Sequence, residues 1–423
     1  MDKLERQLII DLIQREVIPA IGCTEPVSVA LAVAKATELL GTRPDFIEVY
    51  LSPNVLKNAM GVGIPGTGMY GLPIAIAMGA ICGKSAYGLE VLKEITPALV
   101  EEGKKMISDK KMKISLTDKN VDKLYIEVVA TQLSHTSTAV ISEDHTRFSL
   151  LKYDGKTLFK SENEESTPDS APTTIPLSFD KVCDFALTTP VEELRFILKT
   201  VEINKAAASE SLKGIYGHGI AQTLAGGLMG NNVYTHMLSY TAAACDARMA
   251  GAMIPVMSNS GSGNQGITAT LPVSVFAEET GKPEEELIRA LSLSHLMTIY
   301  IKESLGRLSG LCGAVVAATG SSCGITYLMG GTREQIGYAI KNMIGNITGM
   351  ICDGAKPSCT LKVSNGVSTA TLSAMMAIDN KVVTSVEGIA DEDVDKTIHN
   401  LTKIGRVGML ETDRMILEIM TTK

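Results

Sequence analysis

Three cysteines in the last third of the chain could bind a metal cluster. Cys352 and Cys359 are the first and last residues of the segment Cys-Asp-Gly-Ala-Lys-Pro-Ser-Cys. Cys312 lies forty residues before Cys352, in Gly-Leu-Cys-Gly. Thiolates are soft ligands that hold iron–sulfur clusters, and a set of three would leave one corner of a cluster open. On spacing alone, however, three unrelated buried cysteines are the simpler account.

Zinc and disulfide chemistry explain these cysteines less well. A structural zinc site normally has four ligands with a close pair such as Cys-x2-Cys, and no such pair or neighbouring histidine is present here. The spacing also differs from the ferredoxin runs that supply four cysteine ligands. The N-terminal residues lack the apolar core and cleavage site of a secretory signal. We therefore expect a cytoplasmic protein whose eight cysteines stay reduced.

A further cysteine, Cys23, lies at the start of an expected helix. In Ile-Gly-Cys-Thr-Glu-Pro, Thr24 has the residue type of an N-cap and Pro26 that of a first turn. The positive end of the helix dipole would lower the pKa of the Cys23 thiol and favour the thiolate. Cys23 is therefore a candidate base, nucleophile or ligand. An equally good account makes it a small apolar residue that fills the helix entry.

The composition argues against nucleic-acid and membrane partners. The 423 residues include 39 basic and 47 acidic ones, for a net charge of -8, and no basic run is interleaved with aromatic residues. Four stretches longer than a membrane span carry no Asp, Glu, Lys or Arg: residues 58–83, 214–245, 249–277 and 308–332. They are dense in Gly, Ser, Thr, Asn and Pro, which a lipid-exposed helix does not tolerate. We expect them to pack in the interior, with an active site where they converge.

Hydrophobic periodicity changes along the chain. Residues 27–40 and most of the chain after residue 191 show helical spacing. Residues 46–51 and several segments between residues 113 and 159 alternate as strands do. The polar, proline-bearing run of residues 160–176 predicts an exposed linker or loop.

These patterns predict an α+β fold. A mainly α-helical catalytic domain would comprise residues 1–83 and 201–423. A smaller α/β domain of residues 84–200, containing an antiparallel sheet, would be inserted into it.

Six short motifs, specific together rather than singly, carry a family resemblance. They are Ile21–Pro26, Ser52–Asn58, Gly61–Gly66, Gly261–Gly266, Gly310–Gly313 and Met350–Gly354, the last joined by Cys359. With these motifs the chain resembles the L-cysteine desulfidase family, a branch of the iron–sulfur-dependent L-serine dehydratase superfamily. The resemblance covers nearly the whole chain.

The resemblance implies a [4Fe-4S] cluster held by Cys312, Cys352 and Cys359, with Cys23 as a base or otherwise essential thiol. Serine dehydratases have a longer spacing between their last two motif cysteines and a Cys-terminated tail. Here six residues separate Cys352 from Cys359, and the chain ends in Thr-Thr-Lys, so both departures favour the desulfidase branch. The implied reaction is β-elimination, in which L-cysteine and water give hydrogen sulfide, ammonia and pyruvate. The open iron would act as Lewis acid while Cys23 removes the Cα proton.

Two regions are candidates to bind the substrate, a small amino acid. Backbone amides of Gly261–Gly266, with the side chains of Ser262 and Asn264, form a candidate nest for the substrate carboxylate. The other candidates resemble the Ser-His-Thr motif of serine dehydratases and would reach the substrate from the inserted domain: Ser134, His135 and Thr136. A strand-end histidine that caps backbone explains His135 equally well.

Three other functions stay open. An L-serine dehydratase would use the same cluster. A pyridoxal-phosphate lyase would perform the same elimination, and Ser260–Gly266 superficially resembles its carboxylate loop, but no Schiff-base lysine is evident in a matching context. A cluster-based redox sensor would need an attached DNA-binding or partner-binding module, and none is visible in the sequence. We expect a homodimer that binds neither nucleic acid nor membrane.

Overall fold

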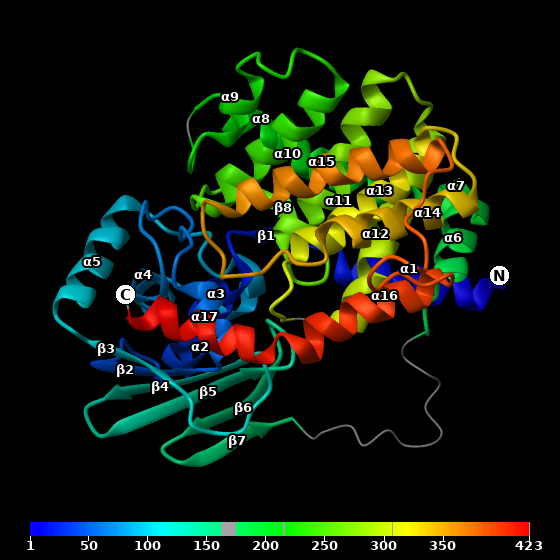
Figure 1. The fold of residues 1–423 in the computed structure, drawn as a ribbon. Coiled ribbons are helices and arrows are strands. Elements are labelled where there is room, and N and C mark those ends of the chain that lie inside the picture. Colours follow the sequence, from blue (N-terminus) through cyan, green and yellow to red (C-terminus); the bar gives the residue numbers. More distant parts are fainter. Residues whose placement is uncertain (162–174, 215, 307, 423) are drawn as a thin grey trace, which may run out of the picture.

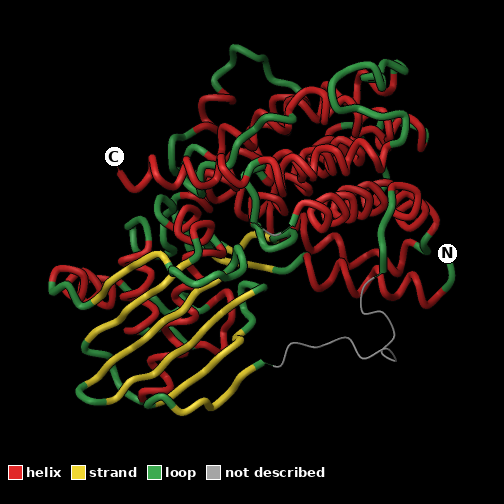
Figure 2. The backbone as a smooth tube through the Cα atoms, turned by 60° about the horizontal axis from the view of Figure 1, so that its bottom comes forward, coloured by secondary structure: helices red, strands yellow, loops and turns green. Residues whose placement is uncertain are grey.

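The computed structural model describes residues 1–161, 175–214, 216–306 and 308–422. Most of the predicted linker, residues 162–174, lies outside the described residues. In the described chain a large helical body stands beside a unit built on a sheet (Figures 1 and 2). The predicted α+β class is confirmed.

The helical body contains the N-terminal helix and most helices after residue 178. Its elements are α1 (Lys3–Glu16), α6 (Phe179–Thr188), α7 (Val191–Leu194), η2 (Arg195–Ile197), α8 (Leu198–Ser211), α9 (Ile220–Ala225), α10 (Val233–Met249), α11 (Gly263–Glu279), α12 (Glu284–Leu305), α13 (Gly313–Leu328), α14 (Arg333–Ile347), α15 (Cys359–Ile378) and α16 (Val394–Lys403). Helix α13 packs against α11, α12, α14 and α15 and is almost wholly buried. Its small residues permit close approach, since a Cβ on Gly320 would lie 2.3 Å from the Ser294 carbonyl oxygen of α12.

The sheet has six strands in the order β3-β2-β4-β5-β6-β7. They are β2 (Phe46–Leu51), β3 (Met112–Leu116), β4 (Tyr125–Gln132), β5 (His135–Ser142), β6 (Phe148–Tyr153) and β7 (Lys156–Lys160). All neighbours are antiparallel except β2 and β3, which are parallel, so the sheet is mixed rather than purely antiparallel. The parallel pair arises because the chain passes through several helices between these two strands.

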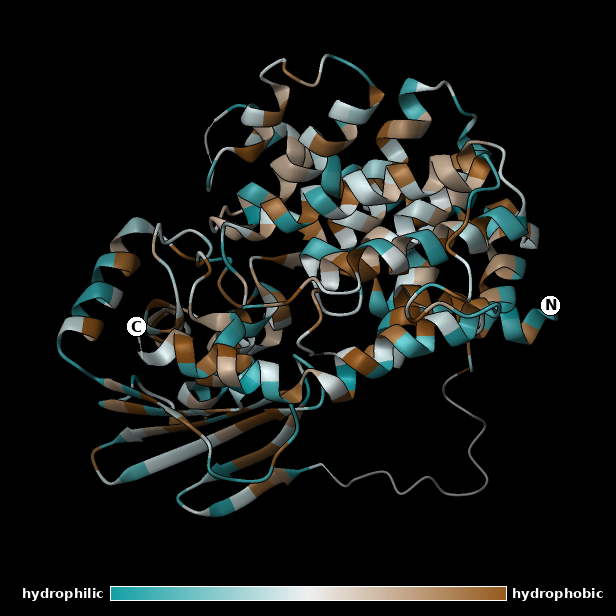
Figure 3. Cartoon of the chain, viewed as in Figure 1, coloured by the Kyte–Doolittle hydropathy of each residue, from teal (hydrophilic) through white to brown (hydrophobic). Residues whose placement is uncertain are grey.

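Helices that precede β3 cover one face of this sheet. They are α2 (Thr24–Leu40), α3 (Pro53–Ala59), α4 (Leu72–Ile81), η1 (Ser85–Glu90) and α5 (Pro97–Ser108). Helices α2 and α4 share an apolar core with β2, β4 and β5, so residues 1–83 contribute to the sheet unit as well as to the helical body. Outer helices such as α5 carry both hydrophilic and hydrophobic residues (Figure 3), as expected for a helix that packs one face on the core and exposes the other to solvent.

Two further connections matter for the site. Strand β1 (Pro19–Ile21) pairs with β8 (Pro255–Met257), which brings the chain before Cys23 beside the chain before Ser262. At the C-terminus, α16, the π-helical turn η3 (Ile404–Gly408) and α17 (Leu410–Thr422) run from the helical body toward α3 (Figure 1). We call residues 394–422 the C-terminal strap. Among the described helices none is long and apolar enough to span a bilayer.

Candidate active site

One cavity of about 100 Å³ lies where the helical body meets the sheet unit. The predicted site residues that line it are Cys23, Ser262, Asn264, Cys312, Cys352 and Cys359. Other polar residues in its wall include Glu25, Asn58, His145, Arg248, Gln265 and Lys302. Thiols from the two ends of the chain therefore share one cavity.

Four helices start at this cavity. Cys23, Ser262 and Cys312 are the N-caps of α2, α11 and α13, and Cys359 is the first residue of α15. None of these three N-cap side chains accepts a hydrogen bond from its helix. The uncapped first-turn amides and the helix dipoles give the cavity a positive potential that stabilises anions.

Two backbone hydrogen bonds join the loops that carry the late cysteines. The Cys312 N–H donates to the Met350 carbonyl oxygen (2.9 Å), and the Cys352 N–H donates to the Gly310 carbonyl oxygen (2.8 Å). They flank an antiparallel bridge between residues 311 and 351. This pairing brings cysteines that are distant in sequence to the same wall of the cavity.

Burial and repulsion from neighbouring cysteines raise the pKa values of the Cys312 and Cys359 thiols. The pKa of Cys312 is raised to about 12, first by burial and then by Cys352 and Cys359. Burial also raises the pKa of Cys359, against an opposing effect of Lys356. Because metal ligation requires thiolates, metal uptake at these residues would release protons.

The donor set fits a cluster better than a single ion. In the part of the chain that the structure describes, no three His, Cys, Asp or Glu side chains are close enough to hold one metal ion. A four-iron cluster is wider than one ion, so its thiolate ligands stand further apart. Lys362, which is ion-paired with Asp353, interacts electrostatically with Cys312 and Cys352 and would offset the negative charge of a cluster. Thiol type, shared cavity and charge therefore fit a cluster on Cys312, Cys352 and Cys359.

The predicted lowering of the Cys23 pKa is wrong. Cys23 itself, rather than Thr24, is the N-cap of α2, and it is only 3% exposed. Burial and, next, the carboxylate of Glu25 raise the pKa of the thiol well above its ordinary value, which Arg248 offsets only in part. The Cys23 Sγ donates to Glu25 Oε2 at 3.1 Å. At neutral pH the proton therefore stays on Cys23 and the charge stays on Glu25.

Glu25 is the functional residue that the sequence reasoning left without a role. Its carboxylate accepts hydrogen bonds from the Cys23 thiol, from the Thr24 hydroxyl (3.0 Å) and from Asn58 Nδ2 (3.0 Å). Burial raises the pKa of Glu25, but His145, the Cys23 hydrogen bond and Arg248 together hold it below its ordinary value. The sequence did contain a signal for this role, because Glu25 lies two residues after a cysteine at the start of an expected helix.

The sheet unit reaches the cavity through a different residue than predicted. His145, in the turn after β5, lines the cavity and is buried. Ser134, His135 and Thr136 lie at the other end of β5, which at 3.3 Å per residue is roughly 25 Å away. There His135 Nδ1 contacts Asp154 Oδ2 (2.7 Å) in a half-exposed pair. The structure therefore does not bring these three residues to the cavity.

Arg248 is well placed to meet an anionic group. It lies buried in the last turn of α10, where its Nε donates to the Gly22 carbonyl oxygen (3.1 Å) and its Nη1 donates to Asn264 Oδ1 (2.9 Å). A guanidinium has five N–H donors, so donors remain for a carboxylate. The sequence carried a signal for this residue, because Asp246 and Arg248 are the charged residues that separate two charge-free stretches.

Comparison with known proteins places the chain in a family. The family model described as serine dehydratase alpha chain matches residues 86–418. The chain belongs to the serine dehydratase alpha chain family. Members of this family are lyases or dehydratases that usually bind an iron–sulfur cluster.

Relatives of this serine dehydratase alpha chain family member match it over its full length. A UPF0597 protein of Bacteroides fragilis is 63% identical over 427 residues, covering 100% of both chains. UPF0597 proteins of Porphyromonas gingivalis and Oleidesulfovibrio alaskensis are 55% identical over 432 residues and 46% identical over 427 residues, again covering 100% of both chains. These names state no activity, so the choice of substrate depends on the site.

Proposed function

We propose that the protein is an iron–sulfur-dependent lyase that converts L-cysteine and water into hydrogen sulfide, ammonia and pyruvate. The observation that carries the proposal is that Cys312, Cys352 and Cys359 open on the same cavity as the Cys23–Glu25 pair. A [4Fe-4S] cluster on the three thiolates would supply an open iron that acts as a Lewis acid toward the departing sulfur. All other steps are assigned to side chains and amides of the protein.

Positive groups in the cavity would bind the substrate carboxylate. Arg248 has unused N–H donors, and the first-turn amides of α11 follow the N-cap Ser262. Asn264, held by Arg248, lies in the same turn. Anion binding by helix N-terminal amides together with an arginine is a common way to hold a carboxylate.

Acceptor oxygens in the cavity wall suit the substrate ammonium. Asn58 Nδ2 donates to Glu25 and Gln265 Nε2 donates to the Asn259 carbonyl oxygen, which fixes the orientation of both amides. The Asn58 Oδ1 and Gln265 Oε1 atoms have no hydrogen-bond partner among the described residues. Buried unsatisfied acceptors are costly, so a cationic donor that reaches them would be bound favourably.

Elimination needs a base for the Cα proton. Glu25 Oε2 lies 3.1 Å from the protonated Cys23 Sγ and can take its proton. Cys23 passes this proton to Glu25 as its sulfur takes up the Cα proton and the carbon–sulfur bond breaks, so the two residues act as one acid–base unit and no free thiolate forms beforehand. Glu25 then gives the proton to the departing sulfide. The aminoacrylate product tautomerises to an imine, which water hydrolyses to pyruvate and ammonia.

L-Serine is the second candidate substrate and is supported by the name of the family. Anaerobic reconstitution followed by iron and sulfide analysis tests the cofactor. Sulfide release from L-cysteine and pyruvate formation from L-serine then compare the two substrates. A protein that stays colourless and iron-free after reconstitution would remove the cluster from the mechanism. A higher kcat/KM for L-serine than for L-cysteine would make the chain a serine dehydratase.

A further inference from the structure

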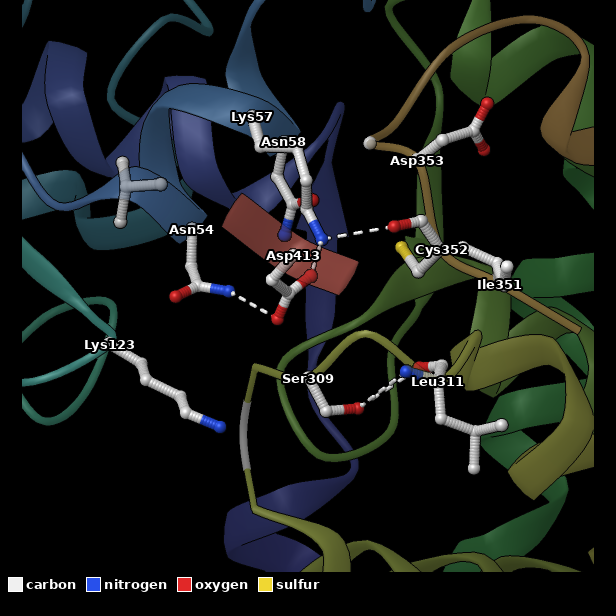
Figure 4. A network of polar contacts seen from close by, with 12 residues as sticks. Asn54, Lys57, Asn58, Lys123, Ser309, Leu311, Ile351, Cys352, Asp353 and Asp413 are labelled. Atoms are coloured by element: carbon white, nitrogen blue, oxygen red, sulfur yellow. Dashed lines mark hydrogen bonds and ion pairs between the residues drawn. The ribbon is translucent and has the colours of Figure 1, made fainter. Parts of the chain in front are cut away.

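A buried ammonium connects the C-terminal strap to the loop that carries Cys352. Lys57 in α3 is 1% exposed. Its Nζ lies 2.5 Å from Asp413 Oδ1 of α17 and 3.0 Å from the Cys352 carbonyl oxygen (Figure 4). Lys57 does not line the cavity, so it has no direct role in the proposed reaction.

The Lys57 ammonium and the Asp413 carboxylate each have hydrogen-bonding partners besides one another. Asn54, one turn before Lys57 on α3, donates from Nδ2 to Asp413 Oδ2 at 3.2 Å, so both oxygens of the Asp413 carboxylate are held by α3 (Figure 4). Burying an ammonium is costly unless a counter-ion and hydrogen-bond acceptors compensate it. Here Asp413 supplies the counter-ion and the Cys352 carbonyl supplies an acceptor. The cysteine loop is therefore one of the groups that make burial of Lys57 tolerable.

The same contacts hold the Cys352 backbone from two sides. Its N–H donates to the Gly310 carbonyl oxygen, and its carbonyl oxygen accepts from Lys57. Close packing adds to this restraint. A Cβ on Gly354 would lie 2.3 Å from the Lys57 carbonyl oxygen, and a Cβ on Gly310 would lie 2.8 Å from Met409 Cβ in the strap. Helix α3 and the strap thus clamp both cysteine loops.

The strap has few other anchors near the site. Among the described residues of α17, Leu417 alone is buried, and several apolar side chains on this helix are exposed. Figure 1 shows α16 against the helical body and α17 beside α3, and Asp413 lies in the first turn of α17, beyond the part of the strap that packs on the helical body.

We propose that Lys57 and Asp413 form a latch through which the C-terminal strap positions Cys352 as a cluster ligand. Lys57 is a positioning residue, because it acts through the backbone of Cys352. The inference rests on the cluster of the proposed function and goes beyond it by assigning a role to α3 and the strap. Contacts that orient metal ligands typically change metal affinity by about 10- to 100-fold when they are removed.

The test compares three variants under anaerobic conditions. Lys57→Met removes the ammonium, and the double variant Lys57→Met/Asp413→Leu replaces the ion pair with an apolar pair, which often preserves stability. Lys84→Met removes the lysine of an exposed ion pair with Glu94 (2.7 Å) and is the matched control. The measurements are the rate at which a chelator removes iron from reconstituted protein, and amide hydrogen exchange of residues 310–313 and 350–354 in the iron-free protein.

We expect Lys57→Met and the double variant to lose iron about 10- to 100-fold faster than wild type, with faster exchange in both loops. The double variant should show this faster iron loss and exchange while its thermal unfolding midpoint stays near that of the wild type. If the Lys57–Asp413 pair only stabilised the fold, these changes would occur together with a lower midpoint. Wild-type iron release and exchange in a folded double variant would overturn the latch, as would an equal effect in Lys84→Met. Should Lys57→Met fail to fold, Asp413→Asn carries the same test, since it keeps the shape of the carboxylate. A wild-type protein that takes up no iron would refute the proposed cofactor, while exchange in the iron-free protein would still decide whether the latch exists.

Discussion

Replacement of Glu25 by glutamine should nearly abolish turnover without removing the cluster. The carboxylate accepts hydrogen bonds from the Cys23 thiol, the Thr24 hydroxyl and the Asn58 amide. Glutamine keeps the shape of the side chain but cannot take the proton of Cys23. General acid–base catalysis contributes about 10²- to 10⁴-fold to a rate, and we expect kcat to fall by this factor. Glu25 lies outside the loops that carry the three cluster cysteines, so iron content should not change.

The pH dependence of this variant separates two mechanisms. The negative charge of Glu25 is the second largest cause of the raised pKa of Cys23, so its removal lowers that pKa. If Cys23 acted as a base without Glu25, the Glu25→Gln variant would form more thiolate and would be at least as active as wild type above about pH 8. If Glu25 is the proton acceptor, the variant stays slow at every pH.

The assay is sulfide release from L-cysteine by anaerobically reconstituted protein, normalised to iron content, with Cα-deuterated substrate to report on proton abstraction. Thr24→Val is the control, because it removes a hydroxyl that lies within hydrogen-bond distance of the same carboxylate oxygen (3.0 Å) and of the Gly261 carbonyl oxygen (2.8 Å), without removing the proton acceptor. One neutral hydrogen bond is worth about 1 kcal/mol, so this control should lose less than about tenfold in kcat. Wild-type turnover in iron-loaded Glu25→Gln would refute the acid–base unit.

Three further outcomes are expected. Cys312→Ala should lose cluster and activity together, whereas Cys23→Ala should keep the cluster and lose turnover, as measured by iron analysis beside the sulfide assay; normal turnover in Cys23→Ala would remove it from the mechanism. Iron and sulfide uptake by the metal-free protein should become more favourable from about pH 6.5 to about pH 8.5, because burial raises the thiol pKa of Cys312 to about 12 and ligation releases its proton. Burial lowers the pKa of His295 in the folded protein to about 3. As the pH falls below about 6.5, this histidine therefore becomes protonated in the unfolded state but stays neutral in the folded state. In urea denaturation, the free energy of unfolding should fall by about 2 kcal/mol between pH 7 and pH 5 because of this group. The His295→Gln variant should not show this decrease, whereas the control His135→Gln should.

Local patterns predicted those parts of the fold that local physics determines. Alternation identified β2 and the strands between residues 113 and 159, and the charge-free stretch of residues 308–332 proved to contain the buried helix α13. The parallel pairing of β2 with β3 was not predicted, because it depends on where the chain returns after α3, α4 and α5. Strand direction and order are tertiary properties that a period-two pattern does not encode.

The candidate site shows the same division. Residue type and glycine-bearing surroundings made Cys312, Cys352 and Cys359 candidates, the family resemblance assigned them to a cluster, and the structure brings them to one cavity. The pKa of Cys23 was predicted with the wrong sign because the helix dipole is visible in the sequence, whereas burial, the larger effect, is not. His145 was missed because the sequence does not tell which end of β5 faces the helical body.

The charges around the cavity favour a zwitterionic substrate. Among the described residues that line it, Glu25 is the one carboxylate, and it stands against Arg248, Lys302 and four helix N-termini. An anion without an ammonium group would meet the positive groups but would leave the unpaired oxygens of Asn58 and Gln265 without a donor. An amine without a carboxylate would leave the first-turn amides of the helices and the remaining donors of Arg248 without an anionic acceptor. A molecule that carries both groups compensates both, and an L-cysteine bound in this way would have its β-substituent free to face the cysteine loops.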